Sequence, residues 1–293
     1  MRRILVTGAN KGIGFAIAKG ILAEAADTVV FLGARDPGRS AEALRALVAI
    51  EPNYGTRVLP VEIDVASDAS VARAAKTVHE MLGGVGLYGV VNNAGIGDGA
   101  HGMRDVLNVN TVGVHRVCES FLPMLEPRGG RIVNVTSAAG PMFVSKCSDP
   151  RRRSFLDPST EWSDLEALMN ECLAMEGDDG AFARAGLGES NPYGLSKACT
   201  NAYTLQLARR HPKLAVNACT PGFIETDMTR RYVVSRGKTA AELGMKTPDE
   251  GARCPVFLLF AELDGSGRYY GSDGKRSPLD RYRAPGSPAY AGD

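Results

Sequence analysis

Apolar and polar positions follow two alternating patterns along the chain. Short, almost continuously apolar runs such as Ile4-Leu5-Val6 recur at intervals and are typical of strands buried on both faces of a sheet. The longer stretches between them carry apolar residues at helical spacing. The predicted strands cover residues 3–7, 29–34, 57–64, 87–92, 131–137 and 215–220, with a last strand near Tyr269. The predicted helices cover residues 14–26, 41–50, 69–82, 105–125 and 192–210, with a further helix starting at Thr247-Pro248.

This alternation predicts an α/β protein with a Rossmann, doubly wound, parallel sheet of seven strands. Residues 1–293 are expected to form a single domain. Residues 141–190 separate a strand from the next helix by more than a short loop, which predicts a helical insertion with a helix near 162–175. Residues 264–293 are rich in Gly, Pro, Ser, Asp and Arg, so we expect a loop or a partly disordered tail.

Composition and charge narrow the class of partner. The 34 lysines and arginines against 33 acidic residues give a net charge of +1, which favours neither nucleic acid nor an anionic membrane. No apolar run approaches the roughly 18 residues of a spanning helix. The six cysteines are scattered, without metal-ligand spacing, and predict reduced thiols and no metal site. We therefore expect a cytoplasmic protein that binds a small molecule.

A glycine-rich turn follows the first predicted strand. Its glycines allow a tight turn and a close backbone approach to a pyrophosphate, whose charge the next helix N-terminus attracts. Such a turn can also bind nothing, but its place at the first strand-to-helix junction favours a nucleotide. The residues expected to contact the cofactor there are Gly8, Asn10, Lys11, Gly12, Ile13 and Gly14.

The end of the second predicted strand indicates which cofactor binds. Arg35 stands where a site for NAD usually has a carboxylate, and a guanidinium there suits the 2′-phosphate of NADP. Lys11 can add a second positive charge, so NADPH is the expected cofactor. In the alternative interpretation, both cations are solvated and Asp36 holds the ribose.

Several motifs together resemble the short-chain dehydrogenase/reductase family. They are the glycine turn, Asn92-Asn93-Ala94-Gly95, Asn110, Ser137, Tyr193-Gly194-Leu195-Ser196-Lys197 and Pro221-Gly222, in the family's order over about 225 residues. The Asn-Lys pair in the turn, the Ala-Arg-Asp at the second strand and the insertion resemble the monomeric carbonyl reductases. The resemblance implies NADPH-dependent reduction of ketones, aldehydes or quinones.

The chemistry of Tyr193 and Lys197 fits this expectation. They lie four residues apart on a predicted helix, so both side chains emerge on one face. An ammonium favours the phenolate of a neighbouring tyrosine, whose pKa is otherwise about 10. Tyr193 can then give a proton to a carbonyl oxygen, while Ser137 hydrogen-bonds the developing alkoxide. Seen alone, such a pair is usually a packing or surface pair; its coincidence with a nucleotide turn favours catalysis.

The resemblance also implies roles for further residues. Lys197 would hold the nicotinamide ribose, and Asn110 matches the residue that anchors a water relay to the lysine, although Asn108 stands nearby. The remaining cofactor contacts implied are Asp64, Val65, Asn92, Ile224 and Thr226. Met142, Trp162, Phe223 and Met228 are candidates for an apolar substrate wall, although such residues are often ordinary core.

Two functional hypotheses follow from these motifs. The first is an NADPH-dependent carbonyl reductase. The second is an NADP-binding sensor or regulatory protein with little catalytic activity, which would gain nothing from keeping Ser137, Tyr193 and Lys197 together. The insertion would cover the surface that pairs subunits in relatives without it, so we expect a monomer.

Overall fold

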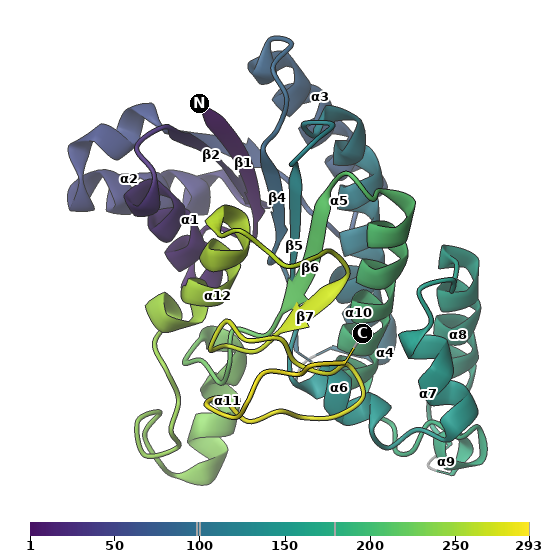
Figure 1. The fold of residues 1–293 in the computed structure, drawn as a ribbon. Coiled ribbons are helices and arrows are strands. Elements are labelled where there is room, and N and C mark those ends of the chain that lie inside the picture. The colour runs from purple at the N-terminus through teal and green to yellow at the C-terminus, as the bar shows by residue number, and fades with distance from the viewer. Residues whose placement is uncertain (98, 100, 179, 293) are drawn as a thin grey trace.

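The computed structural model describes residues 1–97, 99, 101–178 and 180–292. Asp179 and Asp293, which fall in the predicted insertion and tail, lie outside the described residues. Seven parallel strands form one sheet in the order β3-β2-β1-β4-β5-β6-β7 (Figure 1). The strands are β1 Arg2–Thr7, β2 Thr28–Ala34, β3 Val58–Glu62, β4 Gly89–Asn92, β5 Arg131–Val135, β6 Ala215–Cys219 and β7 Arg268–Tyr270. The predicted doubly wound sheet is confirmed.

Helices pack on both faces of this sheet. They are α1 Gly12–Glu24, α2 Pro37–Ile50, α3 Asp68–Leu82, α4 Met103–Leu107, α5 Gly113–Phe121, α6 Ala139–Val144, α7 Asp149–Leu156, α8 Trp162–Ala174, α9 Ala181–Arg184, α10 Pro192–Arg210, α11 Asp227–Arg236 and α12 Pro248–Phe260. Short 3₁₀ turns also form at η1 Pro52–Thr56 and η4 Leu122–Met124. Within the described residues, no helix combines the length and the apolar character needed to cross a bilayer.

Two hydrophobic cores lie on opposite faces of the sheet, because alternate strand residues point to opposite sides. Ile4 and Val6 of β1 pack with α1, α2 and α12. Leu5, between them, packs on the other face with α3, α5 and α10. The near-continuous apolar strands of the sequence therefore serve both cores.

The predicted helix over 105–125 is divided in the structure. Between α4 and α5 the backbone makes a π-helical turn, η3 Asn108–Val112. π-turns are rare and often mark functional positions. Asn110 lies in the middle of this turn.

The insertion consists of helices α7, α8 and α9, which stand beside α10 in Figure 1. Trp162 at the start of α8 stacks on His115 of α5, with ring centroids 3.8 Å apart, and meets Tyr203 of α10 edge-on. Glu161 accepts hydrogen bonds from Gln206 and Arg209 of α10. Helix α8 thus covers parts of α5 and α10.

Candidate active site

Tyr193 and Lys197 lie on one face of α10, as predicted. The helix begins where expected, because the Asn191 side chain accepts a hydrogen bond from the Gly194 amide and Pro192 follows the cap. The Lys197 Nζ atom is 5.6 Å from the centre of the Tyr193 ring. The half-buried phenol and the buried ammonium are therefore close enough to influence each other's charge.

The end of β5 brings Ser137 to the same helix. Lys197 Nζ donates to the Val135 carbonyl at 3.3 Å, two residues before Ser137. The Ser137 hydroxyl accepts a hydrogen bond from the Ala139 amide at 3.2 Å. A Cβ built on Gly140 would stand 3.0 Å from the Lys197 carbonyl carbon, so only a glycine lets α6 approach α10 this closely. The serine turn and the lysine are thus packed together.

Asn110 is completely buried and joins the loop after β4 to α10. Its amide accepts from the Ile96 N–H and donates to the Ile96 carbonyl, each at 2.9 Å, and it also donates to the Ser196 hydroxyl. A Cβ built on Gly95 would be 3.2 Å from Asn110 Oδ1 and 3.6 Å from Lys197 Nζ. Asn110 therefore supports the backbone next to the lysine.

Asn108 has different partners from Asn110. Its side chain accepts from Arg116 and donates to the Ala66 carbonyl, on the side of α5. Of the two asparagines that the sequence left open, the structure brings only Asn110 next to Lys197.

Burial sets the charge of Lys197. Only 5% of the residue is exposed, and this desolvation lowers the pKa of its ammonium to about 8. The group is therefore mostly charged at neutral pH but loses its proton only slightly above it. A lysine with such a pKa is unusual on a protein surface and typical of a functional site.

The glycine turn has the shape that a pyrophosphate needs. Gly8 and Gly12 adopt positive φ angles of 64° and 55°. A Cβ on Gly14 would overlap the Gly8 carbonyl oxygen and lie 2.5 Å from the Asn93 side-chain nitrogen. The N-cap of α1, Lys11, makes no side-chain capping bond, so the first amides of the helix are available to an anion. Ile13 packs against the core below, and Asn10 stands half-buried in the turn.

Asn93 holds this turn in place and is a residue that sequence reasoning missed. Its side-chain nitrogen donates to the carbonyls of Thr7 and Gly8, at 3.0 and 3.3 Å. The Thr7 hydroxyl in turn accepts from the Asn93 and Ala94 amides. These hydrogen bonds tie the end of β4 to the glycine turn. The ribose and nicotinamide of a dinucleotide would lie near this junction.

Comparisons with known proteins agree with this geometry. A family model described as short chain dehydrogenase matches residues 2–148. Carbonyl reductase (NADPH) 1 of Rattus norvegicus is 32% identical over 269 residues, covering 87% of this chain and 89% of its own. The chain belongs to the short-chain dehydrogenase family.

Solved structures of similar shape come from plant and animal enzymes. Salutaridine reductase from Papaver somniferum has a TM-score of 0.74 at 26% identity, covering 92% of this chain and 99% of its own. The NADPH-bound carbonyl reductase from chicken fatty liver has a TM-score of 0.65 at 28% identity, covering 94% and 98%. The similarity to these proteins therefore extends over nearly the whole chain.

The cations expected at the 2′-phosphate lie around the end of β2. Arg35 follows β2 directly and is exposed. Asp36, the alternative ribose ligand, instead caps α2 by accepting from the Arg39 amide at 3.0 Å. Lys11 Nζ contacts Asp227 at 2.7 Å. Arg39, in the first turn of α2, adds a cation that the sequence reasoning did not include. This arrangement fits an NADP-dependent member of the short-chain dehydrogenase family.

Three of the other predicted cofactor contacts, Asp64, Val65 and Asn92, have mixed positions. Asp64 is half-buried at the end of β3 and accepts from the Ala66 amide. Val65 is mostly buried and packs in the core against α5. Asn92 is 3% exposed and donates to Asn134 and Cys118 inside the protein. The Asn92 side chain thus bonds inside the protein, whereas the Asn93 side chain bonds to the glycine turn.

The segment after β6 comes back to the glycine turn. Ile224 is buried, and Thr226 caps α11. The Thr226 methyl is 3.7 Å from the position of a Cβ on Gly12. The structure therefore places Thr226, one of the predicted cofactor contacts, directly beside the turn.

The four candidate substrate residues separate into two groups. Met142, Phe223 and Met228 are large apolar side chains between 43% and 50% exposed. Trp162 is elsewhere, because it stacks on His115 beside Tyr203. Tyr203 lies ten residues along α10 from Tyr193, about 15 Å of helix. The structure does not bring Trp162 to the catalytic groups.

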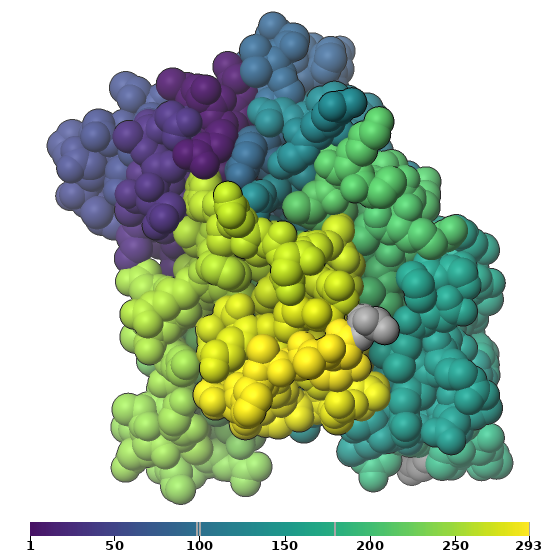
Figure 2. Space-filling model, in the orientation of Figure 1, coloured from purple at the N-terminus to yellow at the C-terminus, as the bar shows by residue number. Residues whose placement is uncertain are grey.

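Residues 271–292 form the tail, which is a packed loop. Arg283 is largely buried and donates to Asp273, to the Ser277 hydroxyl and to the Ser287 carbonyl. The tail fills the lower front of the molecule, between the α11 segment and the insertion (Figure 2). The expectation of a loop is confirmed; partial disorder is not what these contacts show.

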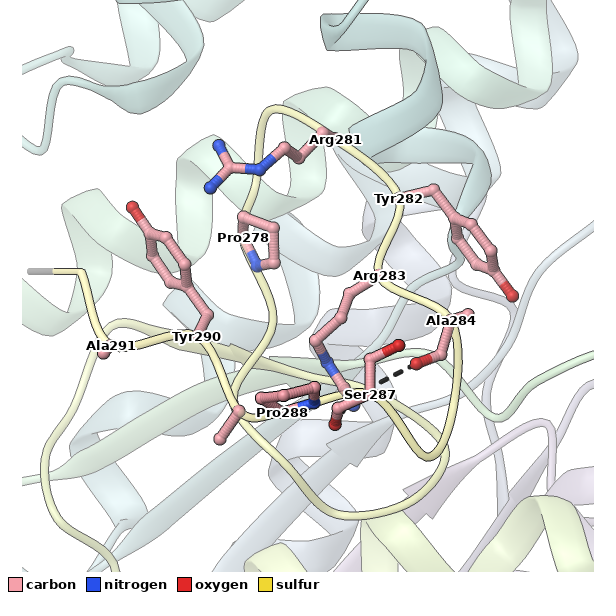
Figure 3. Close-up of a pocket in the computed structure, with 10 residues that line it drawn as sticks. Pro278, Arg281, Tyr282, Arg283, Ala284, Ser287, Pro288, Tyr290 and Ala291 are labelled. Atoms are coloured by element: carbon pink, nitrogen blue, oxygen red, sulfur yellow. Dashed lines mark hydrogen bonds between the residues drawn. The ribbon is translucent and has the colours of Figure 1, made fainter.

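The tail lines an open pocket of about 340 Å³ and also reaches the turn that carries Ser137. Arg281, Tyr282 and Tyr290 line the pocket, with Arg281 above the Tyr290 ring (Figure 3). Arg281 and Tyr282 also line a gap of about 10 Å³ with Ala138 and Pro141, one and four residues after Ser137. Composition alone gave no signal of this contact.

Proposed function

We propose that this protein is an NADPH-dependent carbonyl reductase that acts on a ketone, aldehyde or quinone, with Tyr193 as the proton donor. The observation that carries the proposal is the packing of Tyr193, Lys197 and the Ser137 turn against one another. They lie at the carboxyl ends of the strands, where the glycine turn also lies. The rat relative named carbonyl reductase and the NADPH-bound chicken enzyme support the reaction and the cofactor.

The cofactor has a fitting cradle in this chain. The glycine turn leaves no room for a Cβ at Gly14, the first amides of α1 are available, and Arg35 is exposed. NADPH, when bound, supplies the hydride. The turn and the α1 N-terminus would hold its pyrophosphate, and Arg35 with Lys11 would hold its 2′-phosphate.

Tyr193 moves the proton in this proposal. Its hydroxyl donates to the carbonyl oxygen as negative charge develops there. The Lys197 ammonium, 5.6 Å from the ring centre, stabilises the phenolate that remains. The Ser137 hydroxyl donates a hydrogen bond to the same substrate oxygen and orients it. Asn110 acts as a positioning residue through the backbone beside Lys197.

The activity should depend on the charge of Lys197. Burial lowers its pKa to about 8, so the ammonium is present below that pH and absent above it. A neutral lysine no longer stabilises the phenolate, which makes Tyr193 a weaker acid. We expect kcat/KM for carbonyl reduction to be level near neutral pH and to fall about tenfold per unit well above pH 8.

The Lys197→Arg variant is the control for this pH dependence. A guanidinium keeps its charge throughout the range, so the fall above pH 8 should disappear even if the plateau rate is lower. The same alkaline fall in both proteins would show that another group causes it.

Tyr282 is proposed as a part of the substrate wall that only the fold reveals. It lies beside the turn that carries Ser137, where it lines a gap of about 10 Å³ with Ala138 and Pro141, and 54% of it is exposed. We expect Tyr282→Ala to raise KM for aromatic ketones by about threefold to tenfold, because an aromatic contact is lost, with little change for small aldehydes. Tyr290→Ala is the matched control, since Tyr290 lines only the outer pocket. Equal effects of the two substitutions on every substrate would contradict this role.

Monomeric and cytoplasmic states are also part of the proposal. Helix α8 covers surface on α5 and α10 through Trp162 and Glu161, which supports a monomer. All six cysteines are buried free thiols, which supports a reducing compartment.

The experiment that tests the function is a panel of ketones, aldehydes and quinones assayed with NADPH and NADH in parallel. We expect turnover with NADPH and a clear preference for it over NADH. Tight NADPH binding without turnover of any carbonyl would instead favour the sensor. Preference for NADH would contradict the role of Arg35.

A further inference from the structure

A contact crosses from the glycine turn to the first residue of α11. Lys11 Nζ lies 2.7 Å from the Asp227 carboxylate, and about half of each side chain is exposed. Asp227 therefore neutralises a cation that the proposed function gives to the 2′-phosphate of NADPH.

Further cations surround this carboxylate. The Arg230 guanidinium contacts its other oxygen at 2.8 Å. The pKa of Asp227 is held below its usual range, first by Lys11 and then, among smaller contributions, by the charges of Arg230 and Arg39. Lys11 from the glycine turn and Arg230 from α11 thus both contact this one acidic group. A phosphate monoester is the ligand that such a convergence of cations recognises.

The first turn of α11 is held in this position by other contacts. The Thr226 methyl lies against Gly12, 3.7 Å from where its Cβ would be. Arg231 donates to the Gly99 carbonyl at 2.5 Å, in the loop after β4. The contacts of Thr226 and Arg231, as well as the ion pair, therefore keep Asp227 beside Lys11.

We propose that Asp227 occupies the anion site of the 2′-phosphate and thereby limits the preference for NADPH over NADH. This inference rests on the proposed function, in which Lys11 and Arg35 hold that phosphate. Binding of NADPH must displace the carboxylate from Lys11 or place a phosphate beside it, and either costs free energy. NADH, which lacks the phosphate, leaves the ion pair intact.

Removal of the negative charge of Asp227 should therefore strengthen NADPH binding. We expect Asp227→Asn to lower the Kd for NADPH by about threefold to fivefold at low ionic strength, the range for an exposed ion pair. The Kd for NADH should change by less than about twofold. Asp227→Glu should behave like the wild type, and the gain should shrink in high salt because exposed charges are screened.

The test is a titration of each protein with NADPH and with NADH, followed by calorimetry or cofactor fluorescence. Asp249→Asn is the matched control, because Asp249 forms a comparable exposed pair with Lys19 at 2.6 Å and involves α1 and α12 instead. The same Asp227→Asn change in a Lys11→Ala background should have a smaller effect, since the two side chains are coupled.

The outcomes distinguish a failure of this inference from a failure of the proposed function. A wild type that prefers NADPH while Asp227→Asn binds it no better, or more weakly, overturns the inference and leaves the proposed function standing. An equal gain for NADPH and NADH also overturns it, because the 2′-phosphate is then not involved. A wild type without preference for NADPH overturns the cofactor proposal and the inference together.

Discussion

Replacing Tyr193 with phenylalanine is expected to lower kcat for NADPH-dependent carbonyl reduction by about 100-fold or more. The substitution removes one hydroxyl and leaves the ring in place beside Lys197, so the proton donor is lost without a cavity. Binding of NADPH should stay within about twofold, because the ring is not part of the glycine turn. Steady-state kinetics and cofactor titration measure the two quantities.

Tyr54→Phe is the control for the loss of a phenol. Tyr54 is buried in the other core, against α2, and takes no part in the proposed chemistry. If the Tyr193→Phe and Tyr54→Phe enzymes had the same kcat, the Tyr193 hydroxyl would not be the proton donor.

Gly14→Ala is expected to abolish measurable NADPH binding, with a loss of about 100-fold or more. The added methyl overlaps the Gly8 carbonyl and reaches the Asn93 side chain at 2.5 Å. The Gly8 carbonyl and the Asn93 side chain are part of the hydrogen bonding that holds the turn in shape. The added methyl therefore forces the backbone that faces the pyrophosphate to shift. The Kd for NADPH and the melting temperature should be measured together, since the turn also packs against β4.

Gly20→Ala tests whether any added methyl in α1 has this effect. At Gly20 the new methyl meets a single side-chain methyl of Val256, at 3.0 Å, and no part of the glycine turn. We expect this variant to bind NADPH as the wild type does. A folded Gly14→Ala protein with unchanged NADPH affinity would show that the turn does not hold the cofactor.

The sheet was predictable because its signal is local. The central strands are buried on both faces, so they contain apolar runs such as Ile132-Val133. The start of α10 was predictable for a similar reason, since Asn191 and Pro192 cap the helix within four residues. These patterns placed Tyr193 and Lys197 on one helix face before their surroundings were known.

Other parts of the site depend on contacts between distant residues. The π-turn at Asn110 differs from an α-helix by one hydrogen-bond step, which leaves no periodic signal. Asn93, and not Asn92, hydrogen-bonds to the glycine turn. Alternation along a strand predicts that these two side chains point to opposite sides. The sequence alone does not indicate which of the two adjacent asparagines points to the turn. The Arg283–Asp273 pair orders a tail whose composition is that of a loop.

The central claim is spatial: a phenol, an ammonium and a serine hydroxyl surround one end of a dinucleotide that lies on the glycine turn. A crystal structure of the complex with NADP⁺ tests it most directly. The account predicts the 2′-phosphate near Arg35 and Lys11, and the nicotinamide ribose within hydrogen-bonding distance of Lys197, next to Tyr193. A nicotinamide bound away from these side chains, or a cofactor bound elsewhere on the sheet, would contradict it.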